Sequence, residues 1–509
     1  MDPVYIGGVG MTRFGSSDRG LLDLLRDAGC EALESHEGGV PEAIFIGAMS
    51  PESLGHISNL ATAAAHVLGL SGTPAIRVET ASSSGAAVFA VAASAVASGQ
   101  YQRVLAIAGE KMTGLPTPEI TRVLAEVIDT DERNVGLTMP AMAALIARAY
   151  AHSERLGDNR LKELLARIAI KAHANGARNP RAHFQRAITL DAYHQGKPIA
   201  DPLGIYDCAP ISDGAAAVVL TSGRTDIRVA GLGQGTDTPS LRGRRSLTGF
   251  PATTQAARKA YRMAGFGPSA IDFAEIHDAF TIFELTSMQD LGLFEGKAAL
   301  EAIELEQTGL SGNLPINPSG GLKSRGHPVG ASGLAQIVEA ALQMRGQAGE
   351  DRQLERTARV LAHSIGGPGS NNFVALLERP GSPSLSTPVP GIPIISEEPE
   401  KAVTAKAEAG AAILQVGRVE SFTTLHTPAA GFPSPLTLAL VGMLDGTHVL
   451  APASALGLRI GARAAISHAA DGLPTLTLLP PRKLGLRWIK ANASKARRLF
   501  GRRPASPVG

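Results

Sequence analysis

The chain contains an internal duplication, and this feature constrains its fold more than any other. An apolar segment that ends in glycine, Tyr5-Ile6-Gly7-Gly8-Val9-Gly10, has a counterpart in Val229-Ala230-Gly231-Leu232-Gly233. A second apolar segment, Ala43-Ile44-Phe45-Ile46-Gly47, corresponds to Phe273-Ala274-Glu275-Ile276-His277. Short apolar segments of this kind, bounded by turn residues, are typical of buried β-strands.

In both halves a turn rich in serine or glycine follows these strands and opens an apolar helix. Ser82-Ser83-Ser84-Gly85 opens the first helix, and the segment 320–333 opens the second. Each half then closes with another apolar strand, at 104–108 and at 360–363. Units of strand, helix and strand repeated in the same order predict a duplicated α/β core. Such cores bind ligands at the carboxyl ends of their strands.

Composition divides the 509 residues further. A polar, basic stretch of helical pattern between the repeats is predicted to lie over the core as an insertion. After Glu378 the chain becomes rich in proline and serine, which indicates an extended linker. Short apolar strands separated by Gly and Pro then predict a small β-barrel. The predicted units are 1–225 (first half, with the insertion at about 115–203), 226–379 (second half), 380–412 (linker), 413–480 (barrel) and 481–509 (basic tail).

Charge and cysteine content exclude several functional classes. The net charge of +2 predicts no nucleic-acid partner. The two cysteines, Cys30 and Cys208, are too few for a disulfide scaffold or a multi-cysteine zinc site, so no metal is expected. Cys30 falls in an apolar helical pattern and is predicted to be a core residue.

The location of the protein is predicted from what its sequence lacks. No run of about 20 apolar residues is free of polar ones, and no secretory signal or peroxisomal address is found, so we expect a cytoplasmic protein. The basic tail at 482–503 contains Trp488 and Phe500. It either stays free or lies on an anionic membrane surface, and we favour the free tail.

Four motifs resemble those of the thiolase superfamily, and they occur in the same order. The first is similar to the nucleophile turn and the second to the His-Asp-Cys-Phe motif of sterol-carrier-protein-type thiolases. The third resembles the Gly-His-Pro motif of the superfamily, and the fourth stands in the place of its Cys-x-Gly motif. They are Glu79-Thr80-Ala81-Ser82-Ser83-Ser84-Gly85, His277-Asp278-Ala279-Phe280, Gly320-Gly321-Leu322-Lys323-Ser324-Arg325-Gly326-His327-Pro328 and Ser364-Ile365-Gly366-Gly367.

The resemblance covers about residues 3 to 378 and implies a fold and a substrate class. It implies the duplicated thiolase fold, layered α/β/α/β/α, and a homodimer. The expected substrate is an acyl-CoA thioester, with no permanently bound cofactor. The barrel region, notably Val419-Glu420-Ser421-Phe422-Thr423-Thr424, resembles OB-fold domains that accompany acyl-CoA thiolases. Such a domain is a candidate surface for a protein partner.

The chain departs from the family at the two positions that usually carry catalytic thiols. Ser82 occupies the position of the nucleophilic cysteine, while Ala279 and Ser364 occupy the two positions that supply the proton-transfer cysteine in different members. A serine hydroxyl is hardly ionised at neutral pH, so it needs a base within hydrogen-bonding reach. Family counterparts of Cys208 often carry cysteine without a catalytic role, so we do not expect Cys208 to replace the missing thiols.

The motif order supplies His327 as that base, and the Ser82–His327 pair predicts an acyl-serine intermediate. The other reading of Ser82 is a helix cap, a role that serine commonly fills. The resemblance implies that His277 and His327 polarise the thioester carbonyl. It also implies that the backbone N–H groups of Ser82 and Gly366 form an oxyanion hole. Adjacent His363 is expected to be structural.

The phosphates of CoA require cationic side chains, and the insertion contains several. Arg167, Lys171, Arg178 and Arg181 are the candidates, without a choice among them. Taken together, the sequence predicts a thiolase-like acyl-CoA acyltransferase of the acetyl-CoA acetyltransferase type. Two alternatives remain, a non-covalent acyl-CoA lyase of aldol type and a catalytically silent CoA-binding scaffold.

Overall fold

A computed structural model gives the fold and describes residues 2–36, 38–382, 415–469 and 472–479. The predicted linker at 380–412 and basic tail at 481–509 fall almost wholly outside these residues. In the first half, five strands lie in the order β3-β2-β4-β7-β1. Their bounds are β1 (Tyr5–Met11), β2 (Ala43–Gly47), β3 (Ala75–Val78), β4 (Arg103–Glu110) and β7 (Gly214–Thr221).

The second half repeats this arrangement in the order β8-β11-β10-β9. Ile316 pairs with Ala274 beside β9, in the place that β3 has in the first half. The strands β1 and β8 meet at the pair Tyr5–Arg228, which joins the halves into one nine-stranded path. The bounds are β8 (Arg228–Thr236), β9 (Phe273–Glu275), β10 (Arg359–Gly366) and β11 (Asn371–Glu378).

Helices cover both faces of each half. Successive side chains along a strand point to opposite faces of the sheet, so both faces carry apolar residues that need to be buried. In β4, Val104 and Ala106 pack in a cluster with the central helices α4 (Ser84–Ala97) and α14 (Ser332–Met344). Leu105 and Ile107 pack instead with the outer helix α1 (Leu21–Glu34). On the far side, α10 (Pro251–Ala264) packs on β8 and β11. The duplicated α/β core is therefore present, and α4 and α14 start in the two turn segments that were predicted to open the central helices.

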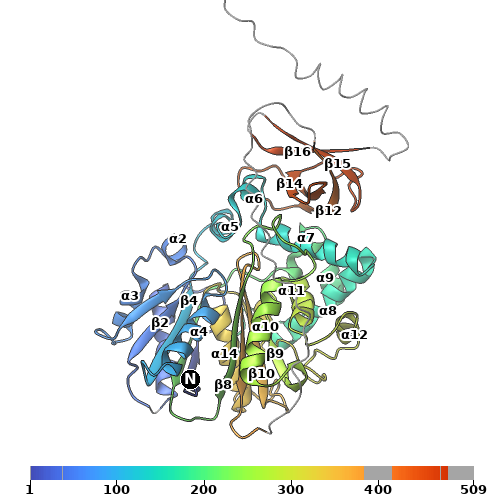
Figure 1. Ribbon diagram of the computed structural model, residues 1–509. Coiled ribbons are helices and arrows are strands. Elements are labelled where there is room, and N and C mark those ends of the chain that lie inside the picture. The colour runs from blue at the N-terminus through green and yellow to red at the C-terminus, as the bar shows by residue number, and fades with distance from the viewer. Residues whose placement is uncertain (1, 37, 383–414, 470–471, 480–509) are drawn as a thin grey trace, which may run out of the picture.

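The predicted insertion folds mainly into helices. The helix at 117–125 packs on the helix at 51–55 of the first half, and the helices from 139 onward lie over the second half (Figure 1). The main element of the insertion, α8, packs against α13, α12, α11 and α9. The elements of the insertion are α5 (Thr117–Ala125), α6 (Thr130–Asn134), α7 (Met139–Ser153), α8 (Asp158–Ala177), α9 (Leu190–His194), β5 (Pro198–Ala200), β6 (Leu203–Gly204) and η1 (Ile205–Asp207). The remaining elements of the core are α2 (Pro51–Gly55), α3 (Leu60–Val67), η2 (Pro268–Ala270), α11 (Thr281–Asp290), α12 (Ala298–Glu304) and α13 (Gly321–Ser324).

The C-terminal region forms an antiparallel sheet above the insertion (Figure 1), and this sheet continues into β5 and β6 of the insertion through the pair Leu425–Ala200. Its strands run β14-β13-β12-β15-β16, with bounds β12 (Gln415–Leu425), β13 (Leu436–Met443), β14 (His448–Pro452), β15 (Arg463–His468) and β16 (Pro474–Leu478). Ser421 donates a hydrogen bond to the carbonyl of Leu145 in α7 at 2.7 Å. The guanidinium of Arg148 lies 4.3 Å from the centre of the Phe422 ring. These contacts attach the sheet to the insertion and not to the strands of the core.

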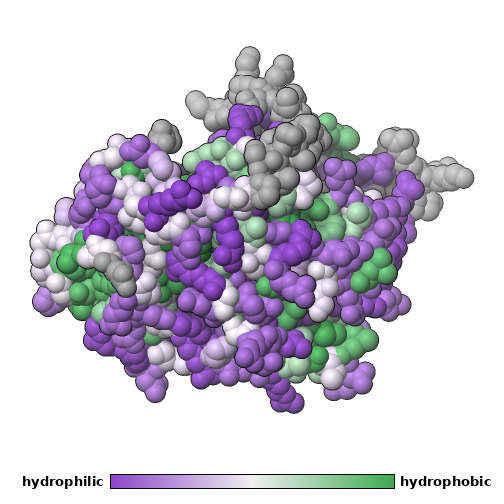
Figure 2. All heavy atoms as spheres, turned by 90° about the horizontal axis from the view of Figure 1, so that it is seen from below, coloured by the Kyte–Doolittle hydropathy of each residue, from purple (hydrophilic) through white to green (hydrophobic). Residues whose placement is uncertain are grey.

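The face of the molecule drawn in Figure 2 is mainly hydrophilic, with hydrophobic residues in separate small patches. In the part of the chain that the structure describes, no helix is both long and apolar enough to cross a membrane. Within the same ranges, no cluster of side chains suitable for a metal ion is found.

Candidate active site

The serine turn between β3 and α4 has a strained backbone. Ala81 adopts a left-handed conformation with φ of 56°, which costs a residue with a Cβ about 1–2 kcal/mol. Two neighbours stabilise it: the carboxylate of Glu79 accepts the N–H of Ala81, and the hydroxyl of Ser84 donates to the Ala81 carbonyl at 2.7 Å. Ser82 follows directly and is 8% exposed. This geometry resembles the turns that present a nucleophile at the start of a helix.

Close packing of the two central helices brings the serine turn to the Gly-His-Pro loop. A Cβ on Gly85 would lie 2.7 Å from the backbone nitrogen of Leu334 and 2.8 Å from the carbonyl oxygen of Gly330. A Cβ on Gly333 would lie 2.6 Å from the nitrogen of Ala86. Only glycine allows the backbones of α4 and α14 to approach so closely. The duplication therefore positions the first turns of both helices side by side.

His277 and His327 face one another at this point. His277 follows β9 and His327 precedes α14, and their rings form an edge-to-face pair with centroids 5.2 Å apart. Burial lowers the pKa of His327 to about 3. Burial and the neighbouring His327 hold the pKa of His277 well below its usual value. Both imidazoles are therefore neutral at physiological pH.

The hydrogen bonds around Ser332 assign the tautomer of His327. Nδ1 of His327 lies 2.7 Å from the hydroxyl oxygen of Ser332. That hydroxyl donates its single proton to the carbonyl of Pro328 at 2.8 Å, and a carbonyl can only accept. With the hydroxyl directed to Pro328, Ser332 accepts from His327 in the tautomer that carries the imidazole proton on Nδ1. Nε2 is left with a free lone pair, as a general base requires.

The hydroxyl of Ser82 makes a different bond from the one that the sequence suggested. It donates to the carbonyl of Ile365 at 2.9 Å and not to His327. A proton transfer between Ser82 and His327 thus requires rotation of the serine side chain. Gly366, the other proposed oxyanion donor, directs its N–H to Oδ1 of Asn372 at a long 3.4 Å, so this donor is only weakly engaged.

The structure places no base at the two altered cysteine positions. Side chains alternate along β10, so Ser364 and His363 face opposite sides of the strand. Ser364 lines a small internal cavity with Gln336 between α4 and α14, and its hydroxyl has no hydrogen-bond partner among the residues that the structure describes. His363 bonds Thr253 of α10 at 3.0 Å. Ala279 is buried, and its carbonyl accepts the N–H of Ala209 at 2.8 Å.

Neither cysteine takes the place of the missing thiols. Burial raises the pKa of the Cys208 thiol to about 12, so this thiol stays protonated. Its Sγ lies 3.5 Å from the carbonyl oxygen of Gly204. Cys208 pairs with Phe280 and the nearby Ile211 pairs with His327, so this segment braces both histidine motifs. Cys30 is half-buried in α1, away from the serine turn.

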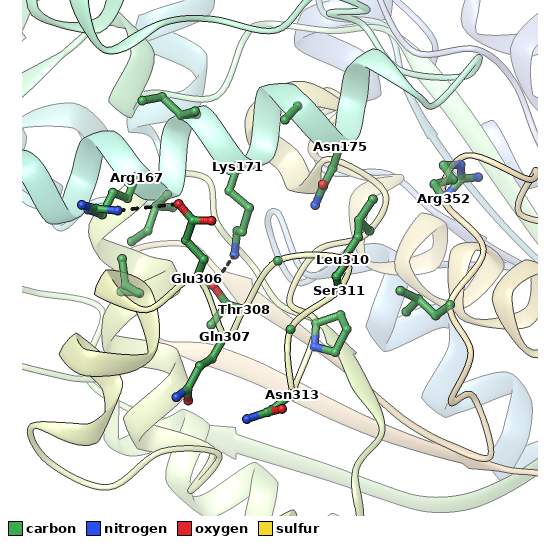
Figure 3. A pocket seen from close by; sticks show the side chains of 18 of the residues that line it. Arg167, Lys171, Asn175, Glu306, Gln307, Thr308, Leu310, Ser311, Asn313 and Arg352 are labelled. Carbon is green, nitrogen blue, oxygen red and sulfur yellow. Dashed lines mark hydrogen bonds and ion pairs between the residues drawn. The ribbon is translucent and has the colours of Figure 1, made fainter.

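Three of the four predicted CoA-binding residues line one cleft, shown in Figure 3. The cleft measures about 1330 Å³ between α8 and the loop after α12, and Arg167, Lys171 and Arg178 face it. Lys171 is paired with the buried carboxylate of Glu284 and reaches Thr308 at 3.4 Å. Arg181 lies elsewhere, bound to Glu31 and to the carbonyl of Met11. Acidic and basic side chains are equally frequent in the lining, so charge alone does not select a phosphate there.

Family models match most of the chain. The N-terminal domain of thiolase matches residues 4–224, and a domain described as thiolase C-terminal domain-like matches residues 233–379. The chain belongs to the thiolase superfamily. Its similarity to sterol carrier protein 2 and to acetyl-CoA acetyltransferases, described next, shows that it is of the sterol-carrier-protein type and an enzyme of the acyltransferase class.

Curated relatives of this thiolase-superfamily chain cover the same region. An acetyl-CoA acetyltransferase from Methanothermobacter thermautotrophicus is 37% identical over 390 residues, which are 74% of this chain and 100% of that protein. Sterol carrier protein 2 from Rattus norvegicus is 32% identical over 75% of this chain and 73% of its own length.

Two solved structures of thiolase-like proteins share the fold. A complex described as the Ltp2-ChsH2(DUF35) aldolase matches with a TM-score of 0.63 and 24% identity, over 75% of this chain and 98% of that one. A monomeric SCP2-thiolase like protein type 1 from Mycobacterium smegmatis matches with a TM-score of 0.70 and 16% identity, over 93% of this chain and 98% of that one.

Proposed function

We propose that this chain is an acyl-CoA acyltransferase of the acetyl-CoA acetyltransferase type in which Ser82 accepts the acyl group. The observation that carries the proposal is the close crossing of α4 and α14, which brings the serine turn beside the loop of His327. In the tautomer that donates from Nδ1 to Ser332, Nε2 of His327 has a lone pair and can act as a base. A serine hydroxyl needs such a base because it hardly ionises by itself, whereas a cysteine thiol at the start of a helix ionises more readily. The related acetyltransferases support the same reaction class.

The acylation step uses residues of both halves. The Ser82 hydroxyl leaves the Ile365 carbonyl and attacks the thioester carbonyl carbon, while its proton passes to Nε2 of His327. The N–H groups of Ser82 and Gly366 donate hydrogen bonds to the oxyanion, assisted by the positive N-terminus of α4. The C–S bond then breaks, and the CoA thiolate leaves with the proton from His327. The neutral imidazole of His277 helps to polarise the thioester carbonyl.

Formation of a carbon–carbon bond would need a further base, which neither Ala279 nor Ser364 supplies. We therefore propose transfer of the acyl group to an acceptor that carries its own nucleophile, such as a thiol. CoA would extend over the insertion, where Arg167 and Arg178 are the cations whose bonds leave them available for phosphate.

A second candidate is a non-covalent acyl-CoA lyase of aldol type. It is favoured by the bond from Ser82 to the Ile365 carbonyl, which leaves His277 and His327 free to act on a substrate without an acyl-serine. In this reaction the histidines would move the proton of a β-hydroxyl group as the carbon–carbon bond breaks. Ser82 would only cap the start of α4.

Intact-protein mass after incubation with a panel of acyl-CoA thioesters separates these candidates. The acyltransferase gains the mass of the acyl group, Ser82→Ala does not, and Ser364→Ala behaves as the wild type. Turnover of a β-hydroxyacyl-CoA that survives Ser82→Ala would establish the lyase instead. Binding of CoA by calorimetry without turnover of any thioester would identify a silent binding protein and refute both.

The C-terminal sheet is proposed to be an OB-type barrel that offers a surface to a protein partner. The support is its strand order, together with contact between β14 and β16, which brings the two edge strands of the sheet together. A homodimer is proposed through the edge strand β3, where Ile76 is 58% exposed beside unpaired backbone groups. Sedimentation of the wild type and of Ile76→Lys tests this, since a dimer is expected to dissociate in the variant.

A further inference from the structure

Arg244 is a buried cation whose side chain has no hydrogen-bond partner. It lies between β8 and α10 and is 4% exposed. Among the described residues, none accepts a hydrogen bond from Nε, Nη1 or Nη2. The guanidinium lies 5.4 Å from the centre of the Phe250 ring. A charge in this position is costly to the fold unless it serves a ligand.

The acidic groups near Arg244 are occupied with other partners. Burial lowers the pKa of Arg244 to about 10, and the nearby carboxylates of Asp237, Glu132 and Asp290 oppose this shift. Glu132 accepts the backbone N–H groups of 241 and 242, Asp290 accepts that of 250, and Asp237 accepts that of 238. These carboxylates stabilise the positive charge from a distance without accepting a hydrogen bond from the guanidinium.

The guanidinium of Arg244 lies close to Gly366, whose N–H is proposed to bind the oxyanion. Nη2 of Arg244 would lie 2.8 Å from a Cβ on Gly369, and the N–H of Gly369 donates to the carbonyl of Gly366 at 3.1 Å. Adding standard bond lengths, Nη2 lies no more than about 9 Å from the Gly366 carbonyl oxygen. A short acyl chain held at Gly366 can span this distance.

We propose that Arg244 binds a carboxylate at the far end of the acyl chain, so that the substrates are short dicarboxylic acyl-CoA thioesters such as succinyl- or glutaryl-CoA. This inference rests on the proposed function for the placement of the thioester at Gly366. An arginine fork matches a carboxylate with two parallel hydrogen bonds. The phosphates of CoA lie on the opposite side of the thioester, beyond the whole pantetheine arm, and so do not reach the same fork.

The test compares succinyl-CoA with butyryl-CoA, which has the same chain length and no terminal charge. In the wild type we expect kcat/KM for CoA release, and affinity by calorimetry, to favour succinyl-CoA by about 10- to 100-fold, because a buried charged hydrogen-bond pair is lost with the neutral chain. Arg244→Met is expected to abolish this preference and to leave butyryl-CoA and free CoA within about threefold of the wild type. The neighbouring Arg245, which is exposed, supplies the control variant Arg245→Met, which should keep the preference.

Several outcomes would overturn the inference. Equal use of both thioesters by the wild type would do so, as would an equal loss of succinyl-CoA, butyryl-CoA and CoA binding in Arg244→Met. Failure of the proposed function is seen separately. If no thioester is turned over but succinyl-CoA still binds more tightly than butyryl-CoA, and Arg244→Met removes the difference, the carboxylate site stands without the acyl-serine. Thermal unfolding of Arg244→Met and Arg244→Gln checks that the fold survives, and the same criteria apply to either variant.

Discussion

Removal of the Ser332 hydroxyl tests the proposed role of His327 without touching either reacting group. In Ser332→Ala, Nδ1 of His327 loses its acceptor at 2.7 Å inside a buried site. The Nδ1–H tautomer is then destabilised by about 1–2 kcal/mol, the cost of a buried donor left without a partner. The proton shifts toward Nε2, and the base is lost in that fraction of the molecules. We expect the rate of Ser82 acylation to fall by about 5- to 30-fold with little change in KM.

The assay is the rate of acyl-mass gain under single turnover, together with nitrogen NMR of the histidine side chains to read the tautomer directly. Ser287→Ala is the matched control, because Ser287 is equally buried and its hydroxyl has no partner. If Ser332→Ala keeps both the Nδ1–H tautomer and the full acylation rate, the hydrogen-bond reasoning is wrong. A loss of the same size in Ser287→Ala would show instead a general effect on packing.

Three further predictions follow from the same geometry. Gly85→Ala should destabilise the protein by about 1–3 kcal/mol in thermal or denaturant unfolding, since its Cβ meets the backbone of α14, whereas Gly157→Ala, which meets nothing within 4 Å, should not. Ser364→Ala should leave acylation unchanged and the free energy of unfolding equal or higher, because it removes a buried hydroxyl without a partner. The pKa of about 3 for His327 predicts that kcat/KM stays flat as pH falls from 8 through 6.5 to 5, and a titration near 6.5 would contradict it.

The lowered pKa of His327 also predicts that the free energy of unfolding decreases in acid. Unfolded His327 takes up a proton near pH 6.5, but the folded protein binds that proton only near pH 3. Between these values the unfolded state holds more protons, so acid favours unfolding. The contribution of His327 is therefore complete above pH 6.5 and is lost as the pH falls toward 3. Replacement by glutamine should remove this part of the pH dependence of unfolding.

The sequence was sufficient to predict the core because both halves contain the same order of strands and central helix, packed in the same way. Gly85 and Gly333 occupy equivalent positions in the first turns of α4 and α14, and each meets the backbone of the other helix. Short apolar strands and apolar helices are also local signals, so their ends could be predicted to within a few residues. The motif histidines were found for the same reason, since their spacing to glycine and proline is visible in one chain.

The contacts that tune the site could not be read in this way. A serine at the first position of a helix is usually a cap, and nothing in the sequence distinguishes Ser332 as the acceptor for His327. Arg244 stands in the run Arg242-Gly243-Arg244-Arg245, and only the fold separates the buried arginine from half-buried Arg242 and exposed Arg245. The alternation of β10 could have predicted that Ser364 and His363 point to opposite faces. The partner of the Ser82 hydroxyl, which comes from 283 residues away, could not be predicted.

With serine in place of cysteine, the reaction depends on the negative charge that forms on the thioester oxygen of the substrate. An imidazole with a pKa near 3 is a weak base in the empty site, because burial opposes its charged form. As the thioester carbonyl becomes an oxyanion nearby, that negative charge offsets the cost of the imidazolium, and the base strengthens as the reaction proceeds. A cysteine at the start of α4 would ionise without this help. We therefore expect Ser82 to react with thioesters, whose thiolate leaves readily, and to remain inert toward amides and toward serine reagents that develop no oxyanion.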